Sequence, residues 1–467
     1  MNYVSTRGSA PVLNFADVLL TGLARDGGLY VPECLPLIDG PALRSFAGRT
    51  YAEVAVEVMW PFVEGSIERD AFVAMVGDTY SPAVFRHPDV CPLVDLGDQT
   101  WLLELFHGPT LAFKDVALQL VGRLFDHVLS SRGERLTIVG ATSGDTGSAA
   151  IEACRDRDAL DVFILHPAGR VSEVQRRQMT TVDSPNVHNI AVEGTFDDCQ
   201  DLVKALFGDL GFRDELRLSA VNSINWARIL PQTVYYVSAA VALGAPEQSL
   251  TFAVPTGNFG NVLAGDIARR MGLPIDHLVV GSNRNDILTR FLDTGRMEMA
   301  EVHPTTSPSM DIQVSSNFER LLFELHGRDG AMVTRLMEQF RATGRMDVAE
   351  ERMAELRSVF DGARLDDAEV ARVIASTWER AGVLVDPHTA VGLGAAQACR
   401  RDPDAVMVAL ATAHPAKFPD AVEAATGVRP ALPTHLADLF DRPERMVTLP
   451  NDQATVASFV REYARSV

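Results

Sequence analysis

The sequence predicts an α/β protein with largely parallel sheets flanked by helices. Strand-like segments alternate with helix-like segments through the middle of the chain, as they do in βαβ units. Several of the strands run into Gly-rich turns, and ligands of parallel sheets bind at the carboxyl ends of strands. The predicted strands cover residues 136–140, 161–165, 187–192, 249–254, 277–280 and 405–410. Predicted helices cover 148–154, 172–179, 196–207 and 286–292, and a further helix follows residue 261 and ends at 271.

Two regions lack this alternation of strand, turn and helix. Residues 1–95 are predicted to form a mostly helical N-terminal domain. Residues 300–380 begin with a polar stretch and continue as charged amphipathic helices, such as 348–360. The sequence therefore predicts three parts: 1–95, an α/β domain over 96–245, and a second α/β domain over 246–467 with a helical insertion at about 300–380.

Composition narrows the class of protein. The chain has 467 residues, of which 47% are hydrophobic and 22% charged, as is typical of a globular protein. A net charge of −20 argues against nucleic acid as a partner. No apolar run is long enough to span a membrane, and no signal peptide is predicted. The five cysteines are widely spaced without a C-x-x-C motif, so reduced cytoplasm is expected, and no histidine pair has the spacing of metal ligands.

Lysine is rare in this chain, because only three of the 42 basic residues are lysines. Arginine can replace lysine as a surface charge but cannot supply a primary amine that forms an imine. Lys114 has mainly apolar neighbours that would desolvate its amine and make it a nucleophile or base. The alternative is a lysine that reaches the surface from the start of a helix. Lys204 is expected to be a plain surface charge, whereas Lys417 follows a predicted strand and is a weaker functional candidate.

A Gly-rich turn, Thr256-Gly-Asn-Phe-Gly-Asn261, lies between a predicted strand and a predicted helix. Glycines permit close backbone approach, and the N–H groups at a helix start bind anions. The turn lacks the Lys-Ser/Thr of a P-loop and the third glycine of a dinucleotide motif, so a small phosphorylated ligand is favoured over a nucleotide. A tight turn without a ligand is equally compatible with the pattern.

Two further segments could bind anions. Thr142-Ser-Gly-Asp-Thr-Gly147 follows another strand, and its hydroxyl and N–H groups suit a carboxylate. Asp145 is unexpected in an anion site and would need an opposing donor or a cationic partner; a simple capping turn is the alternative. In Asn222–Arg228, the side chains of Ser223, Asn225 and Arg228 suit a phosphate or carboxylate. The alternative there is a polar loop with its arginine on the surface.

A lone lysine, a phosphate-binding turn and a second anion site form one consistent set. Pyridoxal phosphate would use all three, because it binds lysine through its aldehyde and carries its own phosphate. At this point the sequence resembles the threonine synthase family, in its longer subgroup, among the fold type II (tryptophan-synthase-β-like) pyridoxal-phosphate enzymes. The motifs that carry the resemblance span nearly the whole chain: residues 3–8, 22–32, 106–115, 143–147, 222–228, 257–261, 309–312 with 315–320, and 410–418.

The resemblance implies a role for each matching residue. Lys114, preceded by Phe113, would bind the cofactor covalently, and Asp145 would lie near its phenolic oxygen. Thr412 would hydrogen-bond the pyridine nitrogen. The cofactor phosphate would lie against Gly257, Asn258, Phe259, Gly260 and Asn261. Ser143 and Thr146 are candidates for the substrate carboxylate, and Ser223, Asn225 and Arg228 for the substrate phosphate.

The implied reaction converts O-phospho-L-homoserine and water to L-threonine and phosphate, with Lys114 as the base at Cα. The implied protein is a cytoplasmic monomer or homodimer without metal, membrane or nucleic-acid partner. Within the same fold, a threonine or serine dehydratase or an O-acetylserine-type β-replacement enzyme is the main alternative. A non-catalytic binding protein that keeps the fold is a second, and a nicotinamide dehydrogenase is a third, disfavoured by the missing glycine.

Overall fold

A computed structural model describes residues 1–219 and 222–465. The chain divides into two compact units, each described by itself below. Unit 1 comprises residues 1–18, 23–113 and 223–430, and unit 2 comprises residues 19–22, 114–222 and 431–467. The predicted three-part division of the sequence stays a prediction. Among the described residues, no helix is long and apolar enough to cross a lipid bilayer.

Unit 1 is built on a six-stranded sheet with the order β13-β10-β9-β14-β4-β3. All neighbours are parallel except β3, which runs antiparallel to β4 at one edge. The strands are β3 (Leu93–Asp95), β4 (Thr100–Glu104), β9 (Leu250–Pro255), β10 (Ile275–Ser282), β13 (Phe360–Arg364) and β14 (Val406–Ala411). Three of these, β9, β10 and β14, confirm predicted strands.

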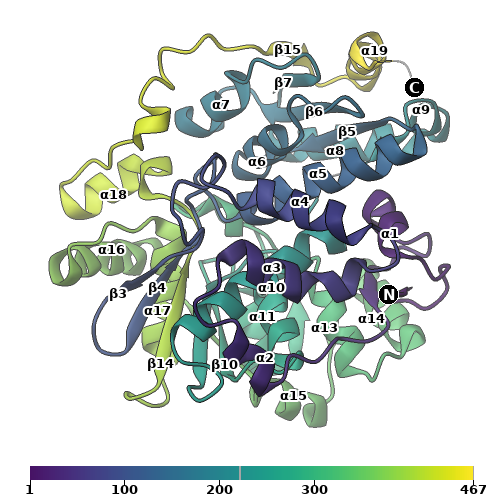
Figure 1. The fold of residues 1–467 in the computed structure, drawn as a ribbon. Helices are drawn as coiled ribbons and strands as arrows, with labels where there is room; N and C mark the ends of the chain where they lie inside the picture. The colour runs from purple at the N-terminus through teal and green to yellow at the C-terminus, as the bar shows by residue number, and fades with distance from the viewer. Residues whose placement is uncertain (220–221, 466–467) are drawn as a thin grey trace. The chain divides into compact units, whose positions relative to one another are not determined.

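Helices cover this sheet, as Figure 1 shows. Helix α17 (Pro387–Ala398) packs against β9, β10 and β14, and its small and apolar side chains form a continuous core with theirs. Helices α10 (Trp226–Ala242) and α11 (Gly260–Arg270) pack against each other. Unit 1 also contains α12 (Ile287–Thr294), α13 (Phe318–Leu325), α14 (Gly330–Thr343), α15 (Glu350–Arg357), α16 (Asp367–Ala381) and α18 (Pro419–Thr426).

The helix predicted over 348–360 is wrong at its C-terminal end. Helix α15 stops at Arg357, and β13 begins at Phe360 and pairs in parallel with residues 278–282 of β10. A distant strand edge supplies the hydrogen-bond partners of this segment, and that contact outweighs local helix preference. The rest of the 300–380 insertion is mostly helical, as predicted, apart from β12 (Arg345–Asp347), which pairs with β11 (Arg296–Glu298).

Helices are the longest elements of the N-terminal region, although they cover fewer than half of residues 1–95, less than predicted. Its helices are α1 (Phe15–Thr21), α2 (Gly40–Ser45), α3 (Tyr51–Val63) and α4 (Arg69–Thr79). Helix α3 begins with a capping box, in which Thr50 and Glu53 satisfy each other's backbone N–H groups. The short strands β1 (Tyr3–Ser5) and β2 (Tyr30–Pro32) form an additional antiparallel pair.

Unit 2 contains a five-stranded sheet with the order β15-β7-β6-β5-β8, and every pairing is parallel. Its strands are β5 (Leu136–Ala141), β6 (Leu160–Pro167), β7 (Val187–Glu193), β8 (Leu218–Ser219) and β15 (Val447–Pro450). Its helices are α5 (Lys114–Arg132), α6 (Asp145–Cys154), α7 (Glu173–Thr180), α8 (Phe196–Gly208), α9 (Leu210–Glu215) and α19 (Gln453–Tyr463). Side chains from β5, β6 and β7 share one core with α8, α9 and α19.

Candidate active site

The predicted site residues divide between the two units. Unit 2 contains Lys114, Ser143, Asp145 and Thr146, and unit 1 contains Phe113 and all the others. The division falls at the peptide bond that joins Phe113 to Lys114. Each group is therefore a separate cluster that the fold of its own unit assembles.

In unit 2, Lys114 begins α5 and its side chain is only 11% exposed. Its Nζ lies 3.4 Å from Oδ2 of Asp145, which begins α6 and is buried. The Nε2 of Gln175 donates to the other carboxylate oxygen of Asp145 at 2.8 Å. The sequence raised the question of how Asp145 is tolerated in an anion site, and unit 2 supplies both a cation and a donor. Lys114, Asp145 and Gln175 are called the lysine cluster below.

The turn that carries Asp145 is held by Thr142. The Oγ1 of Thr142 accepts hydrogen bonds from the backbone N–H groups of Gly144 at 2.9 Å and Gly147 at 2.8 Å. This hydroxyl therefore has the capping role that was one of the two interpretations of the segment. The side chains of Ser143 and Thr146 make no hydrogen bond in the part of the chain that the structure describes; Ser143 is exposed and Thr146 half-buried. Both stand beside Asp145 at the start of α6.

In unit 1, residues Gly257–Asn261, called the glycine turn below, connect β9 to α11. Phe259 adopts a left-handed conformation with φ of 61°. A Cβ on Gly257 would lie 2.9 Å from the carbonyl oxygen of Ser309, so that a side chain there would collide with backbone. The backbone N–H groups in the first turn of α11 lack partners within the helix, and such groups bind anions.

Side chains from the segment before α13 hold the glycine turn in place. The Oγ of Ser315 donates to the carbonyl oxygen of Gly257 at 2.7 Å. The side-chain and backbone nitrogens of Asn317 both donate to the carbonyl oxygen of Asn258, at 3.0 and 3.1 Å. The Nδ2 of Asn317 also donates to the carbonyl oxygen of Ser223 at 3.0 Å. Asn317 therefore joins two segments that the sequence predicted to bind phosphate groups.

Asn261 ends the glycine turn with a buried amide. Its Oδ1 accepts hydrogen bonds from the hydroxyls of Tyr235 at 2.5 Å and Tyr236 at 2.9 Å. Its Nδ2 has no hydrogen-bond partner among residues 1–219 and 222–465. A buried donor without a partner is costly, and a ligand with an anionic oxygen would satisfy it. This donor and the N–H groups of α11 fit the phosphate of the predicted cofactor.

Thr412 follows β14, the strand next to β9 in the same parallel sheet. Parallel neighbours end at the same edge, so Thr412 and the glycine turn lie on the same side of this sheet. The carbonyl oxygen of Thr412 accepts a hydrogen bond from the backbone N–H of Phe113 at 2.8 Å. That bond anchors the residue that precedes Lys114 in the chain.

The remaining lysines differ in their surroundings. Lys417 is fully buried, and its Nζ donates to the carbonyl oxygen of Thr110 at 2.8 Å, so it holds the loop that leads to Phe113. Lys204 is exposed and pairs with Asp201 at 2.8 Å, which confirms the predicted surface charge.

The third predicted anion-binding segment begins α10. The Oδ1 of Asn225 accepts the backbone N–H of Ala227 at 3.0 Å and caps the helix. Arg228 is buried, contrary to the alternative that placed it on the surface, and burial lowers the pKa of its guanidinium to about 10. Ser223 is half-buried, and its carbonyl oxygen is the acceptor for Asn317 described above.

Arg320 is a residue whose importance the sequence did not reveal. It is almost fully buried, and burial lowers the pKa of its guanidinium to about 9. It donates to the backbone carbonyls of Tyr30 and Ile224 and to Oδ1 of Asn317. Arg320 thus ties the asparagine that holds the glycine turn to β2 and to the segment before α10. The sequence signal that was available for Arg320 is its place in the segment 315–320, one of the motifs that carry the family resemblance.

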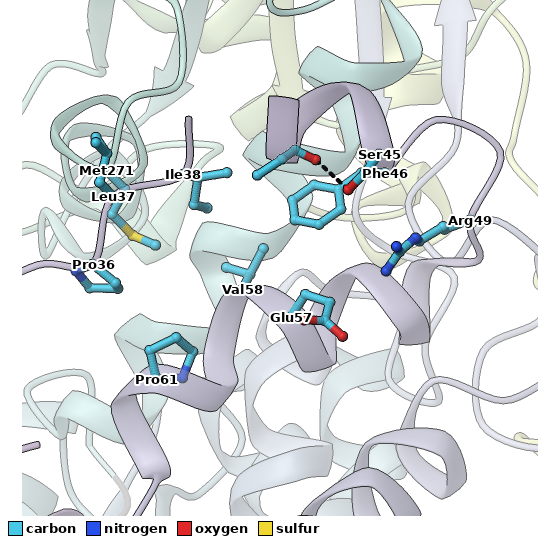
Figure 2. A pocket seen from close by; sticks show the side chains of 11 residues that line it. Pro36, Leu37, Ile38, Ser45, Phe46, Arg49, Glu57, Val58, Pro61 and Met271 are labelled. Carbon is cyan, nitrogen blue, oxygen red and sulfur yellow. Dashed lines mark hydrogen bonds between the residues drawn. The ribbon is translucent and has the colours of Figure 1, made fainter. Parts of the chain in front are cut away.

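A surface pocket of about 280 Å³ in unit 1 is shown in Figure 2. Its walls come from α2, α3 and the segment before α2, and Phe46 and Val58 are among its apolar side chains, with Arg49 and Glu57 also lining it. None of the predicted site residues lines it. Among the described residues there is also no group of three or more His, Cys, Asp or Glu side chains that could hold a metal ion.

Comparison with known protein families accounts for nearly the whole chain. The family model for the threonine synthase N terminus matches residues 2–80. The model for pyridoxal-phosphate dependent enzymes matches residues 91–413, and the model for the threonine synthase C-terminal region matches residues 389–460.

Individual relatives agree with these models. A threonine synthase of Pseudomonas aeruginosa is 58% identical over 99% of this chain and 98% of its own length. A threonine synthase of Corynebacterium glutamicum is 43% identical over 98% of each chain.

Solved structures give the same result. The crystal structure of pyridoxal-phosphate-bound threonine synthase from Brucella melitensis has a TM-score of 0.98 at 55% identity and covers 100% of both chains. The yeast enzyme has a TM-score of 0.94 at 39% identity, covering 99% of this chain and 98% of its own. The chain therefore belongs to the threonine synthase family and is a pyridoxal-phosphate-dependent enzyme of fold type II.

Proposed function

We propose that this protein is a threonine synthase that converts O-phospho-L-homoserine and water to L-threonine and phosphate. The observation that carries the proposal is the buried lysine of a lysine-poor chain, ion-paired with Asp145 at 3.4 Å, in a member of this family. Pyridoxal phosphate supplies an aldehyde for covalent attachment and a ring that accepts the electron pair left when a proton is removed.

Lys114 is the residue that binds the cofactor and then acts as the base. Once the substrate amine has displaced Lys114 from the cofactor, its free amine removes the proton from the substrate Cα. Asp145 keeps the amine in place and neutralises it whenever it carries a proton. A second proton must leave Cβ before phosphate departs from Cγ, and water then adds at Cβ. We assign the return of the protons to Lys114 as well, with the departing phosphate as an assisting base.

The glycine turn is the proposed binding site of the cofactor phosphate. Backbone N–H groups of residues 257–261 and the Nδ2 of Asn261 supply its donors, and the positive end of α11 favours its charge. Phe113 positions the lysine through its bond to Thr412, and the Thr412 hydroxyl is the proposed partner of the pyridine nitrogen. A neutral hydroxyl leaves that nitrogen less protonated than a carboxylate would, which limits side reactions such as transamination.

Substrate recognition is assigned to two groups of side chains. Ser143 and Thr146, beside Asp145 at the start of α6, are the proposed ligands of the substrate carboxylate. Ser223, Asn225 and Arg228 are the proposed ligands of the substrate phosphate, for which a buried guanidinium offers planar, charge-assisted hydrogen bonds. Because Oδ1 of Asn225 caps α10, its Nδ2 would be the atom that donates to the phosphate.

We further propose that the protein works in the cytoplasm as a monomer or homodimer, without a nucleic-acid partner. The five cysteines, none of which forms a disulfide in the structure, support a reducing compartment. The net charge of −20 supports the absence of a nucleic-acid partner. Sedimentation of the purified holoenzyme would establish the number of subunits.

The decisive experiment is to follow product formation by the purified holoenzyme. With O-phospho-L-homoserine we expect phosphate and L-threonine in equal amounts. Threonine and serine are tested separately as alternative substrates, because a dehydratase would convert them to 2-oxobutanoate and pyruvate. Cofactor binding without phosphate release from O-phospho-L-homoserine would refute the proposal.

A further inference from the structure

Gln175 is a buried side chain at the third position of α7, and it was absent from every sequence-based site prediction. It is 3% exposed. Its Nε2 donates to Oδ1 of Asp145 at 2.8 Å, and its Oε1 accepts the hydroxyl of Ser172 at 2.8 Å. The ionised Asp145 carboxylate can only accept and so keeps Nε2 on its side, and the Ser172 hydroxyl supports this orientation by donating to Oε1.

The turn before Asp145 is shaped to accept this amide. Gly144 has φ of 142°, which side chains rarely permit. A Cβ on Gly144 would lie between 2.5 and 2.8 Å from the amide atoms of Gln175. The amide thus lies directly against the backbone of the turn, where it has little freedom to rotate.

Asp145 consequently has a different partner for each carboxylate oxygen. Oδ1 accepts from Gln175 at 2.8 Å, and Oδ2 lies 3.4 Å from the Nζ of Lys114. A buried carboxylate with a donor on one oxygen is stabilised in its ionised form and restricted in its rotation.

We propose that Gln175 is a positioning residue, which holds Asp145 ionised and oriented so that Asp145 in turn holds the amine of Lys114 during turnover. The inference rests on the proposed function, since it assigns Gln175 a part in the same reaction. Gln175 contacts neither substrate nor cofactor in this scheme and acts through Asp145.

The test compares two buried glutamines of unit 2. Gln175→Met removes the donor but keeps the length of the side chain. Gln119→Met makes the same change on α5, where the Nε2 of Gln119 has no hydrogen-bond partner among the described residues. We expect kcat to fall about 10- to 100-fold in the first variant, as for the loss of a hydrogen bond to a charged group, with KM changed less than about threefold. We expect the control to stay within about twofold of the wild type.

Exposed Ser172 offers a second pair of variants that keeps the fold of the buried cluster intact. Ser172→Thr retains both the hydroxyl and the helix cap. Ser172→Asp retains the cap but replaces the donor to Oε1 with an acceptor, so the amide loses the bond on Oε1 that supports its orientation. We expect Ser172→Asp to lower kcat in the same direction as Gln175→Met, and Ser172→Thr to keep the wild-type rate.

The absorbance spectrum of the bound cofactor, recorded without substrate, separates this inference from the proposed function. We expect the spectrum to change in Gln175→Met and Ser172→Asp, because the charge beside Lys114 is altered, but not in the two controls. This readout applies even if the wild type releases no phosphate from O-phospho-L-homoserine. Unchanged spectra together with kcat values within twofold of the controls would overturn the role of Gln175.

Discussion

The lysine cluster and the glycine turn are held together by different kinds of contact. The lysine cluster is held by contacts between charged or polar side chains, as in the pairs of Asp145 with Lys114 and with Gln175. In the glycine turn the contacts are mostly to backbone carbonyls, which Ser315 and Asn317 hold in place. A side-chain cluster should therefore be sensitive to the chemistry of its members, whereas a backbone turn should be sensitive to the space around it.

The largest effect is expected from the lysine cluster. Lys114→Ala removes the only amine in this cluster, so we expect activity to fall by about 10³-fold or more and borohydride no longer to attach the cofactor to the protein. Phosphate release and mass spectrometry after reduction measure both effects. Lys204→Ala is the matched control, because Lys204 is exposed and pairs with the exposed Asp201. Turnover retained by Lys114→Ala would contradict the mechanism.

The glycine turn should respond to added volume. Gly257→Ala would bring a methyl group within 2.9 Å of the Ser309 carbonyl oxygen, so the turn must move. Overpacking of this kind costs about 1–3 kcal/mol, which corresponds to a cofactor affinity about 5- to 150-fold weaker. Equilibrium titration of the cofactor-free protein with pyridoxal phosphate measures the change. Gly211→Ala, whose Cβ would meet its nearest atom only at 3.5 Å, is the control. Equal affinities for the two variants would mean that the turn adapts without cost.

Removing a side chain that holds the glycine turn should have a smaller effect. Asn317→Ala deletes the Nδ2 bonds to the carbonyl oxygens of Asn258 and Ser223 and removes the Oδ1 acceptor of Arg320, but it leaves the backbone bond to Asn258. We expect cofactor affinity to fall only about 5- to 10-fold, because the deleted bonds act on the cofactor through the position of the turn and the backbone bond still holds that turn. Asn189→Ala, which loses a bond to the Met179 carbonyl oxygen in unit 2, should lower stability without this loss of affinity. Equal losses would show that Asn317 acts only through stability.

The smallest effect is expected on thermal stability as the pH changes, through a buried histidine of unit 2. Burial lowers the pKa of His166 from its ordinary value of 6.5. Below pH 6.5 the unfolded chain therefore binds more protons than the folded one, and stability decreases as the pH falls. We expect the melting temperature of the wild type to fall between pH 7 and 5.5 by roughly 1–3 °C more than that of His166→Gln. Calorimetry at the two pH values measures this, and parallel curves for the two proteins would contradict the prediction.

Several parts of this protein were determined by sequence alone. Strands β5, β6, β7, β9, β10 and β14 were predicted near their observed bounds, because an apolar run between turn residues depends only on neighbouring residues. The scarcity of lysine singled out Lys114, and the position of the glycines between a strand and a helix singled out residues 257–261. Together with the second anion-binding turn they predicted pyridoxal phosphate, and the motifs then indicated the family.

Other parts were decided only by the tertiary structure. Residues 360–364 became β13 because the edge of β10 lies beside them, a partner about 80 residues away in the chain. Three side chains hold groups that lie 30 or more residues away in the chain. Gln175 holds Asp145, and Asn317 holds the carbonyl oxygens of Asn258 and Ser223. Arg320 holds the carbonyl oxygen of Tyr30. A polar side chain in a polar segment has no local signature of such a partner, since the hydrogen bond exists only once the fold brings the two groups within about 3 Å of each other.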